Sequence, residues 1–206
     1  MTSFKLASRS IVACLTLGAA LATANVNADP ITRGEVIDSL GGFEHAPDTS
    51  AVRAWGATGA AHLMSVANDV ALPLHVRVRA VHALRAYGTM VPVRTFLRAL
   101  AGVTGQNLFI LRASLDALVE GFNDTVEVAR YLADPRVDVR DGAVWSLAAS
   151  RDPAARAALA ARLTVETDAN VRLTLTTALR NGTTVPAVPT APSGSVTVAT
   201  TRAIGR

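Results

Sequence analysis

Three residue types are scarce in this chain of 206 residues: lysine, the aromatic residues and cysteine. It has one lysine (Lys5) against nineteen arginines, one cysteine (Cys14) and an aromatic share of 4%, although half of its residues are apolar. A single cysteine excludes an internal disulfide framework, so the core alone must hold the fold together. A core with few aromatic rings is built from small aliphatic side chains, which favours helices packed at close distance.

The middle of the chain also lacks an excess of basic residues, although the formal net charge is +4. Residues 29–182 contain sixteen arginines and sixteen acidic residues, and the excess comes from Lys5, Arg9, Arg202 and Arg206. A neutral central region lacks the electrostatic footprint of a nucleic-acid-binding domain. We therefore expect no nucleic-acid partner.

Motifs of catalysis and of cofactor binding are absent from the sequence as well. It contains no Gly-x-Ser-x-Gly, no His-Glu-x-x-His and no glycine-rich phosphate loop. His75 and His82 lie seven residues apart, but no acidic residue occurs between Asp69 and Asp116 to complete a metal site. We interpret both histidines as ordinary helix residues and expect a protein that is not an enzyme and holds no cofactor or metal.

The first 28 residues have the composition of a secretory signal peptide. Lys5 and Arg9 precede an apolar run over residues 11–21, and small-residue cleavage sites end at Ala24 and Ala28. The apolar run is too short for a stable membrane span. We therefore expect cleavage and export to the periplasm or out of a bacterial cell.

Two further features concern the ends of the chain. A lipoprotein anchor at Cys14 is the weaker alternative to simple export, because almost no apolar segment precedes this cysteine. Residues 183–206 contain three prolines, many small polar residues and no acidic residue, a composition typical of disorder. The predicted organisation is a signal peptide over residues 1–28, a folded domain over residues 29–182 and a tail over residues 183–206.

A helical spacing recurs along the predicted folded part. The pair Val-Arg occurs at residues 76–77, 139–140 and 171–172, and each arginine is followed by a small or apolar residue at the third position and by leucine at the seventh. These spacings place the side chains on one stripe of a helix. Two further copies, without the Val-Arg pair, occur at residues 33–40 and 111–118. The three arginines of the pairs are interpreted as ties between neighbouring repeats.

Shorter second helices are predicted between these stripes from their N-terminal signals. Asp124 with Glu127 forms a predicted capping box for a helix that ends at Ala133. Two other second helices follow prolines and cover residues 93–101 and 154–163. Since no alternating apolar and polar run occurs before residue 190, the folded part is predicted to be all-α.

Residues 134–140, with the sequence Asp-Pro-Arg-Val-Asp-Val-Arg, and the following Ala143 and Leu147 resemble the HEAT repeat family. The closest likeness is to the short HEAT-like repeats of the phycobilin lyases, which carry a paired Asp and Arg where this stretch has them, six residues apart. The resemblance covers residues 70–182. It implies a right-handed α-solenoid of about five HEAT-like helix pairs, whose second helices line a concave surface. It implies no particular reaction.

Charge is segregated along the predicted repeats. Residues 70–115 contain six arginines and no acidic residue, whereas residues 116–141 contain seven acidic residues against three arginines. Two interpretations stay open: neighbouring repeats neutralise one another, or part of the basic segment faces a partner.

Arg94 and Arg98 are the leading candidates for a partner-binding surface. They lie four residues apart on a predicted second helix, and the resemblance places them in the concave surface. Arg130, Tyr131 and Arg162 extend this predicted surface. Because a guanidinium fork binds carboxylates or phosphates with two bonds, the favoured partner is an acidic protein or peptide.

The sequence thus predicts a non-catalytic protein-binding or scaffolding module. One alternative is an accessory protein or enzyme that binds an anionic small molecule through the arginine-rich second repeat. Another is self-association through the last helix, behind which no second helix is predicted. Of the two tryptophans, Trp145 is expected in the core beside Leu147, and Trp55 is expected to cap the first repeat.

Overall fold

The computed structural model describes residues 30–42 and 48–181. The predicted signal peptide and the predicted tail lie outside these residues. Within the described ranges, every regular element is a helix, which confirms the all-α prediction.

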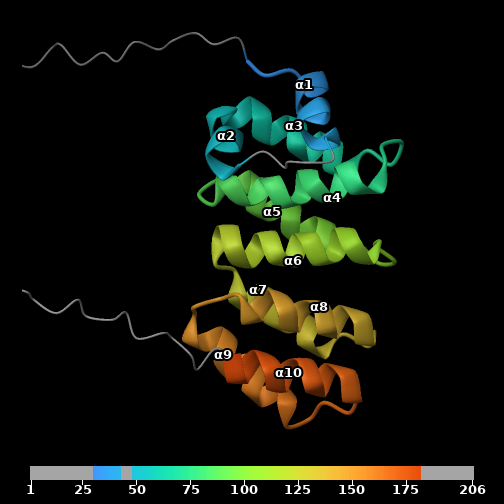
Figure 1. The fold of residues 1–206 in the computed structure, drawn as a ribbon, viewed down its shortest axis with the longest axis vertical. Helices are drawn as coiled ribbons and strands as arrows, with labels where there is room; N and C mark the ends of the chain where they lie inside the picture. The colour runs from blue at the N-terminus through green and yellow to red at the C-terminus, as the bar shows by residue number, and fades with distance from the viewer. Residues whose placement is uncertain (1–29, 43–47, 182–206) are drawn as a thin grey trace, which may run out of the picture.

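The helices form two layers that follow the order of the chain (Figure 1). The first layer of the described part consists of α1 (Arg33–Gly41), α4 (Leu74–Ala83), α6 (Leu108–Phe122), α8 (Val137–Ala148) and α10 (Ala169–Asn181). The second layer consists of α2 (Thr49–Ala54), α3 (Gly56–Asn68), α5 (Val91–Ala101), α7 (Thr125–Ala129) and α9 (Pro153–Leu163). Two short 3-10 helices, η1 (Leu84–Tyr87) and η2 (Arg130–Ala133), extend α4 and α7.

Each helix packs mainly on its neighbours in the stack. In the first layer α4 packs on α6, α6 on α8 and α8 on α10, while α3, α5, α7 and α9 each pack on a first-layer helix. As a result α1 and α10 lie at opposite ends of the long axis (Figure 1). This arrangement agrees with the helix pairs predicted from the recurring spacing.

The core lies between the two layers, and the predicted stripes supply its first-layer side. The buried stripe residues are Val36, Leu40, Ala80, Leu84, Leu111, Ser114, Leu118, Ala143, Leu147 and Leu175. The buried residues of the second layer include Leu63, Val93, Leu97, Val128 and Leu159. Most of these side chains are Ala, Val or Leu, so the scarcity of aromatic residues is matched by a core of small aliphatic groups.

The placement of Trp145 was predicted wrongly. Its side chain is 58% exposed, whereas Leu147 is buried. Because successive helix residues are turned by about 100°, two residues that lie two positions apart point to nearly opposite sides, so only one of them can face the core. Trp55 is half-buried against the core and lies between α2 and α3, and the chain turns into α3 at Gly56, which has a φ of +63°.

Two glycines permit a close approach between η1 and the end of α6. A Cβ atom added to Gly88 would overlap the carbonyl group of Gly121, and one added to Gly121 would overlap the backbone of Arg85. Only glycine therefore fits at this contact between successive first-layer elements.

Candidate partner-binding site

Arg94 and Arg98 of α5 both donate hydrogen bonds to the carboxylate of Asp124, which immediately precedes α7. Arg94 donates from Nε and Nη2 over 3.0 and 2.7 Å, and Arg98 donates from the same two atoms over 2.6 and 2.8 Å. The Asp124 side chain is 3% exposed, while the two arginine side chains are 41% and 42% exposed. The site therefore consists of one buried anion under two half-exposed cations.

The turn after α6 aims Asp124 at α5. Asn123 adopts the left-handed conformation with a φ of +50°, and the Asp124 N–H donates to the Leu118 carbonyl, which closes the end of α6. The Asp124 carboxylate makes no capping bond to α7, so the predicted capping box is wrong. Its oxygens are engaged by charged guanidinium groups instead, which bind a carboxylate more strongly than a neutral backbone N–H does.

The electrostatics of the site keep Asp124 ionised. Burial alone would raise the pKa of its carboxyl, but the hydrogen bonds from Arg94 and Arg98 outweigh burial and lower the pKa to about 2. Hydrogen bonding to Asp124 in turn raises the pKa of both arginines. At neutral pH these three residues carry two positive charges and one negative charge, so the cluster keeps a net charge of +1.

Unused donors remain on the open side of the cluster. Within the described residues neither Arg94 nor Arg98 uses its Nη1 group in a hydrogen bond. The hydrogen bonds to Asp124 also fix the orientation of both guanidinium planes. A fixed pair of half-exposed guanidinium groups can bind a further carboxylate or phosphate with little additional loss of side-chain freedom.

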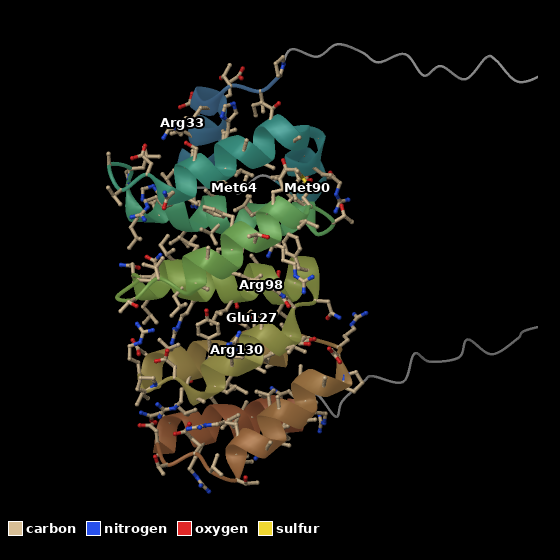
Figure 2. The ribbon with its side chains drawn as sticks, turned by 180° about the vertical axis from the view of Figure 1, so that it is seen from behind. Arg33, Met64, Met90, Arg98, Glu127 and Arg130 are labelled. Atoms are coloured by element: carbon tan, nitrogen blue, oxygen red, sulfur yellow. The ribbon has the colours of Figure 1, made fainter. Side chains whose placement is uncertain are left out.

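Arg130 and Tyr131, two further residues of the predicted surface, lie on η2 in the second layer. Figure 2 shows Arg98, Glu127 and Arg130 one below another along the stack. Arg130 is largely exposed and donates to Glu127 over 3.3 Å. Tyr131 is half-buried, and burial raises the pKa of its phenol. Both residues line a shallow hollow of about 330 Å³.

Arg162, the fifth predicted surface residue, has a different environment. It donates from Nε and Nη2 to Glu166 over 2.9 and 2.8 Å, and most of its side chain is buried. Arg140 also grips Glu166 with two bonds of 2.9 Å. We therefore assign Arg162 to a buried internal cluster and leave it out of the candidate surface.

The arginines of the Val-Arg pairs all donate to groups outside their own helices. Arg140 joins the carbonyls of Asp134 and Pro135 to the Glu166 carboxylate, and so links α8 to the segment before α10. Arg172 donates to the Glu166 carbonyl, and Arg77 donates to the Ala67 carbonyl at the end of α3.

Pairing between neighbouring helix pairs explains most of the charge segregation. Four arginines of residues 70–115 pair with acidic residues of 116–141: Arg85 with Glu120, Arg94 and Arg98 with Asp124, and Arg112 with Asp141. Arg77 and Arg79 bond to backbone carbonyls. The pairing leaves the side chains of Arg94 and Arg98 half-exposed.

A larger hollow of about 730 Å³ lies where α2, η1 and the end of α6 meet. Its polar lining consists of Arg53, Arg85, Thr49, Thr89 and Glu120, of which Glu120 pairs with Arg85. Arg53 donates from Nε to the Ala86 carbonyl and forms no ion pair with any described residue. This hollow adjoins a smaller one lined by Arg79 and His82, and burial lowers the pKa of that histidine.

Neither a metal site nor a membrane helix occurs in the part of the chain that the structure describes. No three His, Cys, Asp or Glu residues gather there as metal ligands. None of the helices there combines the length and the apolar character needed to cross a bilayer.

Comparison of the chain with protein-family models, with curated proteins and with solved structures finds no match. The likeness of residues 134–140 to HEAT-like repeats therefore stays a prediction.

Proposed function

We propose that this protein is a non-catalytic binding or scaffolding module that recognises acidic groups of a protein partner through Arg94 and Arg98. One observation carries the proposal: both arginines are held in place by the buried carboxylate of Asp124, yet both remain half-exposed, with Nη1 groups that bond to no described residue. Arg130 and Tyr131 on the next second-layer element extend the surface. A stack of helix pairs offers an extended surface of this kind.

The test must preserve the hydrogen bonds that hold the buried Asp124 carboxylate. Reversing both charges would place three carboxylates together around a buried position, so the fold itself would suffer. Arg98→Gln is the better variant, because Arg94 still satisfies Asp124. Arg85→Gln is the matched control, since Arg85 is equally exposed and equally paired with one carboxylate, that of Glu120.

The probe is a fluorescent glutamate-rich peptide, compared with the same peptide in which glutamine replaces each glutamate. We expect the wild type to bind the acidic peptide and to lose affinity as salt is added. Arg98→Gln should weaken this binding about tenfold, the scale of one charged hydrogen bond, while Arg85→Gln should bind as the wild type. Equal binding of the two peptides, or unchanged binding by Arg98→Gln, would contradict the proposal.

A second candidate function is supported by the hollow that Arg53 and Arg85 line. The absence of an acidic partner for Arg53 among the described residues favours an anionic small molecule in this place. Thermal unfolding with added phosphate or with small dicarboxylates tests this candidate, and an unchanged unfolding temperature with all of these ligands would exclude it.

Self-association through α10 is a separate alternative. Sedimentation tests it, and a monomer at all concentrations would exclude it.

We further propose that the protein acts outside the cytoplasm of a bacterium. The support is the signal-like composition of the first 28 residues. N-terminal sequencing of the protein from its own cells should find a start after Ala24 or Ala28. A protein recovered with its first residues intact would contradict export.

A further inference from the structure

Four apolar side chains are exposed on the first-layer helices α6, α8 and α10. Trp145 of α8 is the largest, and Phe109, Val137 and Leu173 are exposed on the same three-helix section. Val137 and Leu173 lie at the rim of a shallow hollow of about 600 Å³ between α8 and α10. The helices that carry this face, α6, α8 and α10, follow one another in Figure 1.

A row of hydrogen bonds fixes this face. Arg112 of α6 donates to Asp141 of α8 over 3.2 Å, and Thr174 of α10 donates to the same carboxylate over 2.8 Å. Asp138, Asp141 and Trp145 share one stripe of α8, because their spacings are three and four residues. Ser146, the residue after Trp145, donates to Asp116 of α6 over 2.5 Å.

The face carries three carboxylates, those of Asp116, Asp138 and Asp141. Arg112 pairs with Asp141 and also donates to the Asp138 carbonyl, and Arg136 interacts electrostatically with Asp138. Asp116 and Asp138 form no ion pair with any described residue. Trp145 therefore shares its face with carboxylates, two of which are not held in an ion pair. An indole ring attracts a cation over its face, and tryptophan is the residue that most often anchors a protein interface.

We propose that this face, centred on Trp145, docks a segment of a partner protein in which lysine or arginine residues alternate with aliphatic ones. Its aliphatic side chains cover Trp145, Val137 and Leu173, and its cations pair with Asp116 and Asp138. Charge complementarity decides the class of partner, since an acidic segment would be repelled here. This surface is separate from that of Arg94 and Arg98 and takes partners of the opposite charge.

The experiment uses the full chain and a fluorescent amphipathic peptide of leucine and lysine, with a leucine–glutamate peptide of the same pattern for comparison. The wild type should bind the lysine peptide, and its tryptophan emission should shift to shorter wavelength as Trp145 is covered. Trp145→Ala should weaken binding at least about tenfold. Val126→Ala is the control, because Val126 is an exposed apolar residue of α7 in the other layer.

A second variant separates charge from apolar contact. Asp116→Asn with Asp138→Asn keeps Trp145 and should remove most of the salt dependence of binding. Equal binding of both peptides, no saturable binding, or wild-type affinity in Trp145→Ala would overturn the proposal. A dimer of the protein alone that dissociates in the Trp145→Ala variant would also overturn it, because a second copy of the chain would then occupy this face. None of these results alters the test with glutamate peptides and Arg98→Gln.

Discussion

Replacement of Glu166 by glutamine should destabilise the fold more than any other removal of a single charge in the described residues. The Glu166 side chain is fully buried and accepts six hydrogen bonds: two each from Arg140 and Arg162, and one each from the N–H groups of Thr167 and Asp168. A glutamine would present an NH2 group to some of these donors and would leave two guanidinium groups without a countercharge.

Two independent estimates give the same magnitude. Removal of one partner of a buried ion pair lowers the free energy of unfolding by about 3–5 kcal/mol. The hydrogen bonds from Arg140, against the effect of burial and with help from Asp168 and Arg162, lower the pKa of Glu166 from 4.5 to about 2. At 1.36 kcal/mol per pKa unit this shift corresponds to about 3 kcal/mol. Because the protein is only two helices thick and solvent is close, we expect the lower end, about 3 kcal/mol.

The assay is urea unfolding of the wild type, Glu166→Gln and Glu120→Gln, followed by circular dichroism. Glu120 pairs with Arg85 at the surface, so its replacement should cost about 0–1 kcal/mol. The native pKa of Glu166 lies below its unfolded value, so its contribution is complete above pH of about 4.5 and is lost as the pH falls through about 2. The gap between wild type and Glu166→Gln should therefore narrow with acidification. A loss no larger than that of Glu120→Gln would refute this reasoning.

Three smaller effects follow from the same structure. Asp124→Asn should lower the free energy of unfolding by about 1–2 kcal/mol in urea titrations, less than Glu166→Gln, because the freed Arg94 and Arg98 can turn to solvent. Gly88→Ala should lower the free energy of unfolding by about 1–3 kcal/mol, because the added Cβ atom would overlap the Gly121 carbonyl. The urea titration should then show a lower unfolding midpoint. Trp145→Ser should change the free energy of unfolding by less than about 0.5 kcal/mol, whereas Leu147→Ala should cost about 2–5 kcal/mol; equal losses would contradict the placement of Trp145 outside the core.

The first-layer helices were predictable because their signal is local. A spacing of three and four residues identifies a buried stripe without knowledge of what it packs against, and the leucines at residues 84, 118 and 147 are all buried as expected. The error at Trp145 came from judging its environment by the neighbouring Leu147. Counting around the helix from the stripe would have placed it outside, on the stripe of Asp138 and Asp141.

The candidate site was only half predictable, since its decisive contact is not local. Arg94 and Arg98 were found from their spacing and charge, but Asp124 lies 26 residues beyond Arg98 and has the sequence context of a helix cap. A single sequence gives no means to choose between a bond to the next backbone N–H and a bond to an arginine on the neighbouring helix. The buried cluster around Glu166 was not predicted for the same reason, because its contact with Arg140 joins residues that are 26 positions apart.

The distances along the chain between paired charges explain which surfaces remain for partners. Ion pairs between neighbouring elements join residues that are 26 to 36 positions apart, about one helix pair. A basic segment followed by an acidic one therefore neutralises itself when the pairs stack, and net charge alone carries no information about a partner. Only the groups that this pairing leaves over can recognise another molecule. Among the described residues these include the Nη1 donors of Arg94 and Arg98 and the guanidinium of Arg53 in the second layer, and in the first layer the carboxylates of Asp116 and Asp138, which form no ion pair there. A module with such residues on its two faces can hold an acidic and a basic partner at once, which is the behaviour expected of a scaffold.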